Sequence, residues 1–514
     1  MELEVAASVA LAVLIVAYGF IFGVLKRVNE WIYVSRLGEK RASLPPGDMG
    51  WPLVGKMWSF LRAFRSGDPD SFLSTFISRF GATGIYKTYM FGSQSIIVCK
   101  PETCRRVLTD DQNFKLGYPK AVKVLTGRRS FHSISNAEHK RLRRLTAAPI
   151  TGSEALSMYV PGIEENIVAS LEEWSSSDQP VEFLTGMKKV TFEIITNIFF
   201  GLDQVDFNFK TMEILYGDLA RGMKSAPINF PGFTFHRGVK ARRELVKILQ
   251  AIVDERKALK GRNGSITRKN MLDMLMEVED EDKRKLEEED IIDILLMYLL
   301  AGHETSAHGT MWAALYLHEH PDILQKAKEE QEEIISRRPA TQSGLTLKEI
   351  RQSQYLTRVV DETLRRISLS FAVFREAKAD VNVNGYLIPK GWKVMVSSRA
   401  VHMDPENYLD PKKFDPSRWE NIKAKAGAFL PFGAGSRFCP GSDLAKLEIS
   451  IFLHQFLLHY KLERVNPKSP VSHLPLPHPS DNCLVRFENS IRYLNKFKDI
   501  SAFIILLFPA SVRP

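Results

Sequence analysis

The sequence predicts a mainly α-helical protein with a small β region, preceded by one N-terminal transmembrane helix. Residues 155–265 are helical by pattern, and a nearly continuous apolar run within residues 288–318 predicts a helix that is covered on most sides. Strand-like runs between residues 84 and 98 predict the small β region. The uncharged stretch Val5–Leu25 is long enough to cross a bilayer as a helix.

Composition narrows the class of protein. The chain has 514 residues, 44% hydrophobic and 25% charged, as in a globular protein with a large core. The basic residues are spread along the chain and give a net charge of +10, which favours an acidic partner or anionic lipid and argues against nucleic acid. Four cysteines argue against a disulfide framework and for a reducing compartment. The mixed charges of residues 277–290 predict a solvated connection before the buried helix.

The N-terminal apolar stretch, residues 5–25, is predicted to be an uncleaved signal anchor. Acidic residues precede it, and its apolar run is longer than that of a cleaved signal peptide. Basic residues follow it, so the positive-inside rule predicts a single-pass protein of the endoplasmic reticulum membrane with its main domain in the cytosol. We divide the remainder into a basic and proline-rich hinge (26–52), a main domain (53–486) and a C-terminal tail (487–514).

A loop rich in glycine and proline carries Cys439. The run Pro431–Gly441 holds three glycines and two prolines, which break helices and strands, and a mostly apolar helical pattern follows it. Cys439 therefore lies just before a helix N-terminus, where backbone amides and the helix dipole favour a thiolate. A lone cysteine is more often a small buried core residue. The residues spaced around Cys439 must therefore show whether it is a metal ligand.

That spacing, Phe432-x-x-Gly435-x-Arg437-x-Cys439-x-Gly441, resembles the haem-binding signature of the cytochrome P-450 monooxygenases. The resemblance implies the cytochrome P-450 fold and haem b (iron protoporphyrin IX) as cofactor. It implies that Cys439 is the axial thiolate ligand of the haem iron and that Arg437 pairs with a haem propionate. The glycines would let the loop approach the porphyrin.

A polar segment interrupts the predicted buried helix at Ala301–Ser306. Gly302 weakens a helix, while Glu304 and Thr305 add buried polarity that a purely structural core avoids. A satisfied polar patch is the structural alternative. The segment resembles the oxygen-activation segment of the P-450 family, which implies a local opening for dioxygen, with Thr305 donating a hydrogen bond and Glu304 relaying protons.

Three further residues fit a structural motif of the same family. Glu362 and Arg365 form a helical i,i+3 ion pair, which alone is usually surface decoration. Arg418 follows in the run Phe414–Trp419. The resemblance implies that these three residues form a buried network that holds the cysteine loop and does no chemistry.

Two arginines are candidate propionate ligands. Arg143 lies in a basic helical stretch and Arg375 follows a short apolar run; either alone would more often be a surface charge. The resemblance implies that each binds a haem propionate. His139 stands where the family usually has a tryptophan, so the contact from that position stays open.

Four runs of the sequence resemble the plant ent-kaurenoic acid oxidases: residues 44–52, 104–111, 138–149 and 426–435. This resemblance implies successive oxidations of a small apolar carboxylic acid, the diterpenoid ent-kaurenoic acid, to gibberellin A-12. It also implies dioxygen and a membrane-bound, NADPH-dependent flavoprotein reductase. One basic residue between positions 114 and 129 is expected to pair with the substrate carboxylate, with these candidates: Lys115, Lys120, Lys123, Arg128 and Arg129.

Other functions stay open at this point. The chain could oxidise another terpenoid or sterol, such as a triterpene, or be a non-catalytic haem- or lipid-binding protein. A haem-thiolate isomerase or dehydratase is disfavoured because such relatives usually lack the Glu304–Thr305 pair. The likeness stops at Phe487, so we regard residues 487–514 as an atypical tail and assign it no function.

Overall fold

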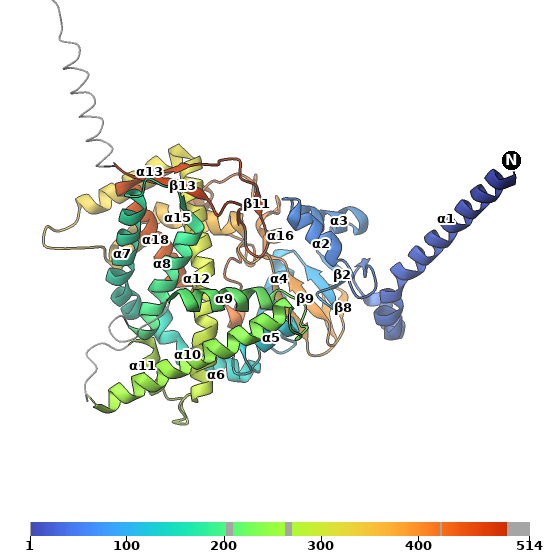
Figure 1. The fold of residues 1–514 in the computed structure, drawn as a ribbon, viewed down its shortest axis with the longest axis horizontal. Helices are drawn as coiled ribbons and strands as arrows, with labels where there is room; N and C mark the ends of the chain where they lie inside the picture. The colour runs from blue at the N-terminus through green and yellow to red at the C-terminus, as the bar shows by residue number, and fades with distance from the viewer. Residues whose placement is uncertain (1, 202–208, 263–269, 422–423, 491–514) are drawn as a thin grey trace, which may run out of the picture. The chain divides into compact units, whose positions relative to one another are not determined.

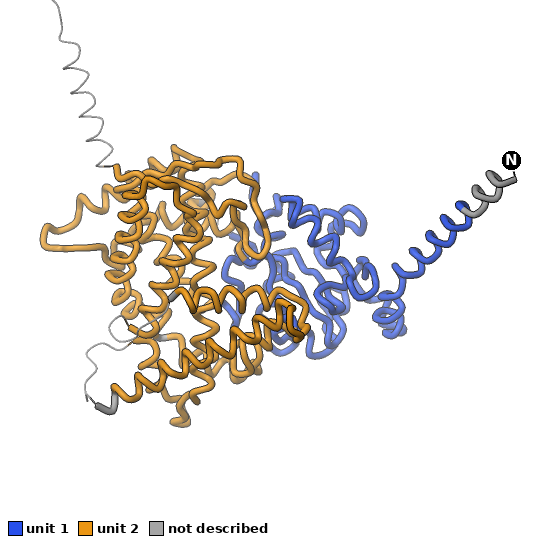
Figure 2. The backbone as a smooth tube through the Cα atoms, in the orientation of Figure 1, with its two compact units in different colours: residues 1–119, 370–411, 424–438 blue, residues 120–369, 412–423, 439–514 orange. Residues whose placement is uncertain are grey.

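The computed structural model describes residues 2–201, 209–262, 270–421 and 424–490. The chain forms two compact units (Figure 2). Unit 1 comprises residues 1–119, 370–411 and 424–438, and unit 2 comprises residues 120–369, 412–423 and 439–514.

Unit 1 is built around a six-stranded sheet. Its central strands are rich in β-branched residues, which favour strands. Ile96 and Val98 pair in parallel register with Val394 and Val396, and all four side chains are buried. The strand order is β1 (Gly47–Asp48), β2 (Ile85–Met90), β3 (Ser93–Val98), β9 (Lys393–Val396), β6 (Val373–Ala377) and β4 (Phe114–Leu116). The predicted β region is confirmed, but only β2 and β3 lie within it; the other four strands of the sheet come from parts of the sequence that were not predicted to join it.

Short helices and one hairpin complete this unit (Figure 1). The hairpin pairs β7 (Val381–Val383) with β8 (Tyr386–Ile388). The helices are α2 (Met57–Arg65), α3 (Asp70–Phe80), α4 (Pro101–Thr109) and α16 (Ser398–His402).

The N-terminal helix α1 (Glu2–Asn29) is long and apolar enough to cross a membrane. Large apolar side chains such as Val16 and Phe20 are more than 70% exposed, which is unfavourable in water and suits a lipid environment. At its end, Asn29 is buried, and its side chain donates hydrogen bonds to the backbone oxygens of Met49 (3.1 Å) and Trp51 (2.6 Å). The last residues of the predicted hinge are therefore bonded to the end of α1, which continues four residues into that hinge.

Unit 2 is mostly helical. Its helices are α5 (Lys120–Thr126), α6 (Asn136–Thr151), α7 (Ser153–Ser175), α8 (Phe183–Phe200), α9 (Phe209–Met223), α10 (Thr234–Arg262), α11 (Met271–Glu277), α12 (Glu288–Glu319), α13 (Pro321–Ser336), α14 (Leu347–Gln352), α15 (Gln354–Ile367), α17 (Arg418–Asn421) and α18 (Ser442–His459). Two small sheets join them: β10 (Tyr460–Arg464), β13 (Leu484–Asn489) and β5 (Val181–Glu182) in one, and β11 (Val471–Ser472) with β12 (His478–Pro479) in the other. Strand β13 extends three residues into the predicted tail, whose residues 491–514 lie outside the described residues.

Helix α12 is the long buried helix that the sequence predicts. Its 32 residues correspond to about 48 Å at 1.5 Å per residue. It starts at a capping box in which Glu287 and Asp290 satisfy each other's backbone N–H groups. Helices α8, α10, α15 and α18 pack around it, which explains why apolar residues occupy all its faces.

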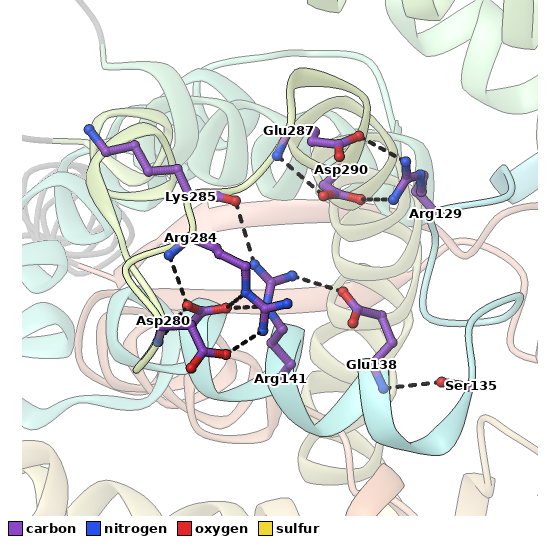
Figure 3. Close-up of polar contacts among 10 residues, drawn as sticks. Arg129, Ser135, Glu138, Arg141, Asp280, Arg284, Lys285, Glu287 and Asp290 are labelled. Atoms are coloured by element: carbon purple, nitrogen blue, oxygen red, sulfur yellow. Dashed lines mark hydrogen bonds and ion pairs between the residues drawn. The ribbon is translucent and has the colours of Figure 1, made fainter.

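The charged run before α12 differs from its prediction. Asp280 and Asp290 have side chains only 4% and 5% exposed, because arginines outside the run cover them. Asp280 accepts a 2.6 Å hydrogen bond from Arg141 Nε on α6, and Arg129 forms ion pairs with Glu287 and Asp290 (Figure 3). The connection is therefore fixed to α6 and to the segment before it rather than solvated throughout.

Candidate functional site

The cysteine loop is shaped by close backbone approaches. Gly433 and Gly435 have φ of 76° and 72°, which favour glycine. A Cβ added to Gly435 would lie 2.5 Å from the backbone oxygen of Leu108 at the end of α4. The need for glycine at position 435 is thus explained by packing within unit 1. Gly441 immediately precedes α18.

Cys439 differs from the other three cysteines of the chain. Cys99, Cys104 and Cys483 are buried, whereas Cys439 is partly exposed. Burial raises the pKa of the Cys439 thiol, although a hydrogen bond from the Gly441 backbone and the charge of Arg143 lower it. The surrounding protein therefore does not ionise this thiol by itself. A bound metal ion would do so, because metal binding displaces the proton of a thiol ligand.

Arg143 lies on α6, two residues after Arg141. Residues two apart point in different directions on a helix. Arg141 binds Asp280, and this contact is the main reason that the pKa of Asp280 falls to about 2 (Figure 3). Arg143 has no hydrogen bond or ion pair within the described chain, yet its charge acts on both Cys439 and Tyr298. It is therefore a half-buried cation that can bind an anion near Cys439.

Unit 1 contains the other two arginines that were predicted to bind a haem propionate, Arg375 and Arg437. Arg375 on β6 is 4% exposed and has no carboxylate within ion-pair distance among the described residues; its side chain donates one bond, to the Phe374 oxygen at 3.3 Å. Burial lowers the pKa of Arg375. Burial and then the charge of Arg375 lower the pKa of Arg437 to about 10. The two guanidinium groups repel each other, so a ligand with two negative charges would stabilise both. The two propionates of haem carry two such charges.

The polar segment of α12 presents two exposed residues within a buried helix. Ala301 and Thr305 are exposed, whereas Leu299, His303 and Ala307 are buried. Residues 301 and 305 are one helical turn apart and so share a face. The Thr305 hydroxyl donates to the Ala301 oxygen at 2.8 Å. This face is the solvent-accessible part of the helix near its middle.

The expected opening in this segment is not a break in the helix, because α12 is continuous through it. Gly302 instead faces α8, where an added Cβ would lie 2.6 Å from Ile195 Cδ1. Glu304 lies 3.7 Å from Lys188 Nζ on the same helix α8. Burial alone would raise the pKa of Glu304, but Lys224 and Lys188 lower it, so this carboxyl is ionised at neutral pH.

The structure brings Glu362, Arg365 and Arg418 together. Glu362 and Arg365 are fully buried and joined by two hydrogen bonds of 2.8 and 2.9 Å. Arg418 Nε donates to Glu362 at 3.0 Å. Two further groups, not predicted from the sequence, donate to the same carboxylate: the Trp419 side chain and the Asp415 backbone, both at 3.1 Å. The position of Trp419 next to Arg418 was the available signal.

The basic residues proposed for a substrate carboxylate are partly engaged elsewhere. Lys115 lies 3.0 Å from Glu376, and Arg129 lies 2.8 Å from Glu287. Lys224, which directly follows α9, was missed. Its side chain has no hydrogen bond or ion pair in the part of the chain described and keeps some contact with solvent. Partial desolvation by the surrounding protein lowers its pKa, and the charge of Glu304 opposes that fall.

Comparison with known proteins gives one consistent result. The Cytochrome P450 family model matches residues 45–483. Ent-kaurenoic acid oxidase 2 of Arabidopsis thaliana is 56% identical over 468 residues, covering 91% of this chain and 95% of that protein. The 7,8-epoxymelianol synthase CYP88A154 of Ailanthus altissima is 55% identical over 476 residues (93% and 96%). Beta-amyrin 11-oxidase of Glycyrrhiza uralensis is 54% identical over 477 residues (92% and 97%).

A solved structure agrees with these relatives. The retinoic acid-bound cyanobacterial CYP120A1 superposes with a TM-score of 0.75 at 26% identity, covering 87% of this chain and 99% of that chain. The predicted fold is thereby confirmed, and the family model covers the cysteine loop, the polar segment of α12 and the Glu362 network. The chain belongs to the cytochrome P450 family.

Proposed function

We propose that this P450 monooxygenase oxidises ent-kaurenoic acid, in successive steps, to gibberellin A-12. The family implies a haem cofactor, dioxygen and electrons from a redox partner; we assign that partner to a membrane-bound NADPH-dependent flavoprotein reductase. When bound, the haem supplies the activation of dioxygen. The residues of this chain supply its attachment, the hydrogen bonds around it and the orientation of the substrate.

In this proposal each residue has a distinct role. Cys439 would hold the haem iron through its thiolate. Arg143 and Arg375 bind the propionates, because each is a half-buried or buried cation with no ion pair within the described residues. Arg437, whose charge interacts with that of Arg375, binds them too. The catalytic pair is Thr305, which donates a hydrogen bond from an exposed position, and Glu304, whose carboxylate oxygen accepts and releases a proton.

The remaining motif residues are structural in this proposal. Phe432, Gly435 and Gly441 shape the loop around the cofactor. The Glu362–Arg365–Arg418 network holds the segment that carries the loop.

One observation supports an acidic substrate over a neutral one. Lys224 and Lys188 both act on the single carboxylate of Glu304, next to Thr305, so the two ammonium groups share one negative charge. A diterpenoid carboxylate would balance the second positive charge. Relatives named ent-kaurenoic acid oxidase occur in both Arabidopsis thaliana and Oryza sativa, at 53–56% identity.

A neutral triterpenoid is the second candidate substrate. Relatives named for melianol-type and β-amyrin chemistry are as similar to this chain as the kaurenoic acid oxidases are, at 54–55% identity. Overall identity therefore does not separate the two substrate classes. The charge at position 224 provides the discriminating test.

The test uses yeast microsomes that contain the full chain and a plant reductase. We expect turnover of ent-kaurenoic acid and little turnover of its methyl ester or of β-amyrin. Lys224→Gln should raise the KM for the acid, while Lys210→Gln, an exposed lysine of α9, should leave it unchanged. Turnover of β-amyrin without turnover of the acid would replace the proposed substrate by a triterpenoid. A reduced protein with no thiolate-type carbon monoxide spectrum would instead favour a non-catalytic role.

We also propose that α1 anchors the protein in the endoplasmic reticulum membrane with both units in the cytosol. The uncharged length of α1 and the basic residues that follow it, Lys26 and Arg27, support this orientation. Protease added to sealed microsomes should digest the catalytic part. A fully protected catalytic part would show the opposite orientation.

A further inference from the structure

The segment that leads into the cysteine loop, residues 427–435, lies along helix α4 within unit 1; we call it the loop leg. A Cβ added to Gly427 would lie 2.2 Å from the backbone oxygen of Pro101, where α4 begins. One added to Gly435 would lie 2.5 Å from the backbone oxygen of Leu108, near the end of the same helix. The loop leg therefore contacts both ends of α4 through its backbone.

One backbone N–H in the middle of the loop leg needs a partner. Leu430 is 5% exposed, and the next residue, Pro431, disfavours a helical conformation at position 430. The Leu430 N–H is therefore not satisfied within a helix, and a buried N–H without a partner is costly. It donates instead to the ring nitrogen Nε2 of His402, the last residue of α16, at 2.8 Å.

This hydrogen bond fixes the chemical form of His402. A backbone N–H can only donate, so Nε2 must offer its lone pair, and the proton of the neutral ring must be on Nδ1. The ring is fully buried and lies 5.8 Å, between ring centroids, from Phe429, the neighbour of Leu430. A second proton on the ring would place two N–H groups head to head. His402 can therefore hold the loop leg only as a neutral imidazole.

A second side chain holds the loop leg two residues earlier. The hydroxyl of Tyr408, a residue that is 1% exposed, donates to the backbone oxygen of Ala428 at 3.1 Å. His402 thus accepts a hydrogen bond from the loop leg and Tyr408 donates one to it, as a neighbouring strand would. The two residues lie close in sequence, and the Tyr408 backbone N–H bonds to the Asp404 oxygen at 3.1 Å, which fixes the segment that carries both.

We propose that His402 is a positioning residue for the thiolate ligand, supported by Tyr408. The imidazole fixes Leu430, and the loop leg carries that fixed position along α4 toward Cys439. The inference rests on the assignment of Cys439 as the ligand of the haem iron under the proposed function. Without the acceptor, the buried Leu430 N–H is unsatisfied, so the loop leg should detach before the protein unfolds.

The test follows purified full-length haem protein in urea below the unfolding transition, with two readouts. One is the fraction of haem that gives the thiolate-type carbon monoxide spectrum, and the other is helical content by circular dichroism. His402→Met has no acceptor of this kind, so the thiolate-type spectrum should be lost roughly tenfold faster while helical content is kept. His402→Gln, whose amide oxygen can accept from Leu430, should restore most of the original rate.

A matched control is His454→Met. His454 is also a buried histidine, 3% exposed, but its ring is bonded to the Gln331 side chain rather than to the loop leg. This variant should lose the thiolate-type spectrum and its helices together. Equal rates in His402→Met and His402→Gln, or the same selective loss in His454→Met, would overturn the proposal.

Two further variants keep the result decisive. If His402→Met incorporates no haem, Tyr408→Phe replaces it: we expect a loss of the thiolate-type spectrum roughly threefold faster, and an unchanged rate would overturn the proposal. Cys439→Ala separates the two assignments. A thiolate-type spectrum in Cys439→Ala would reject Cys439 as the ligand, whereas its absence there, with an unchanged rate in His402→Met, would reject only the positioning role.

Discussion

Glu362 and Glu448 are both fully buried carboxyl groups of unit 2, yet their surroundings are opposite. Glu362 accepts hydrogen bonds from two arginines, one tryptophan and one backbone amide. Glu448 has no partner among the described residues, and burial raises its pKa to about 8. The negative charge of Glu362 is balanced by its arginine partners. Glu448 has no such partner and therefore stays neutral.

This difference teaches how to interpret the other buried polar groups of the chain. Buried charges with full sets of partners stabilise the structure, and those without partners indicate where something else binds. Arg375, 4% exposed and without an ion pair in the described chain, belongs to the second kind. Cys439 is partly exposed and accepts a hydrogen bond from the Gly441 backbone, yet these do not overcome the effect of burial on its pKa.

The largest expected effect extends the comparison to Cys439. Cys439→Ala removes the one group that we assign as the iron ligand, so the reduced protein should lose the thiolate-type carbon monoxide difference spectrum completely. Cys483→Ala is the matched control, because that thiol is buried away from the loop and its pKa is raised to about 12. A normal spectrum in Cys439→Ala would show that Cys439 is not the ligand of the haem iron.

The next prediction concerns Glu362, the buried carboxylate whose charge is compensated by arginines. Arg418→Ala leaves the buried Glu362 carboxylate with fewer cations, which should lower the free energy of unfolding by roughly 3–5 kcal/mol. Thermal unfolding and the yield of haem-containing protein measure this. Arg144→Ala is the control, because its ion pair with Glu281 is exposed and contributes little. Equal effects of the two substitutions would show that the network is not structural.

A third prediction concerns the uncompensated carboxyl. Above pH 4.5 the unfolded chain releases the Glu448 proton, while the folded protein keeps it up to about pH 8. Stability should therefore fall with rising pH across that window, by roughly 1.4 kcal/mol per pH unit from this residue. Glu448→Gln should remove that part of the slope and be the more stable protein at the upper end. Parallel melting-temperature profiles for both proteins would show that Glu448 ionises normally.

The smallest effect on stability is expected at Thr305. Thr305→Ala removes an exposed hydroxyl that bonds only to its own helix, so folding and haem binding should persist. Reducing equivalents should instead appear as peroxide, measured as the ratio of product to NADPH. Thr310→Ala removes a similar bond, to the Ser306 oxygen, from a buried position and should keep the ratio. An unchanged ratio in Thr305→Ala would leave that residue a structural role only.

Much of this molecule could be predicted from the sequence because the signals were local. The apolar run of α12, the glycine-rich loop before α18 and the strands β2 and β3 each lie within a few consecutive residues. The pairs that were missed are long-range. Asp280 finds Arg141 across 139 positions, and β9 joins β3 from almost 300 residues away. The charged run before α12 therefore looked solvated.

Glu448 escaped prediction for a different physical reason. A single glutamate in a helical apolar run normally indicates the solvent-facing side. Helix α18 has no such side at this position, because other helices cover it. Only the three-dimensional structure distinguishes a surface carboxylate from a neutral buried acid here.

The hydrogen bonds from Asn29 have a practical consequence for truncated versions of the protein. Val34, Leu44 and Met49, all before the predicted start of the main domain, belong to the hydrophobic core of unit 1. A soluble version cut at residue 53 would lose these side chains and open that core. A version cut just before Asn29 would keep the core and the two hydrogen bonds that close it, so crystallisation trials should start from that boundary.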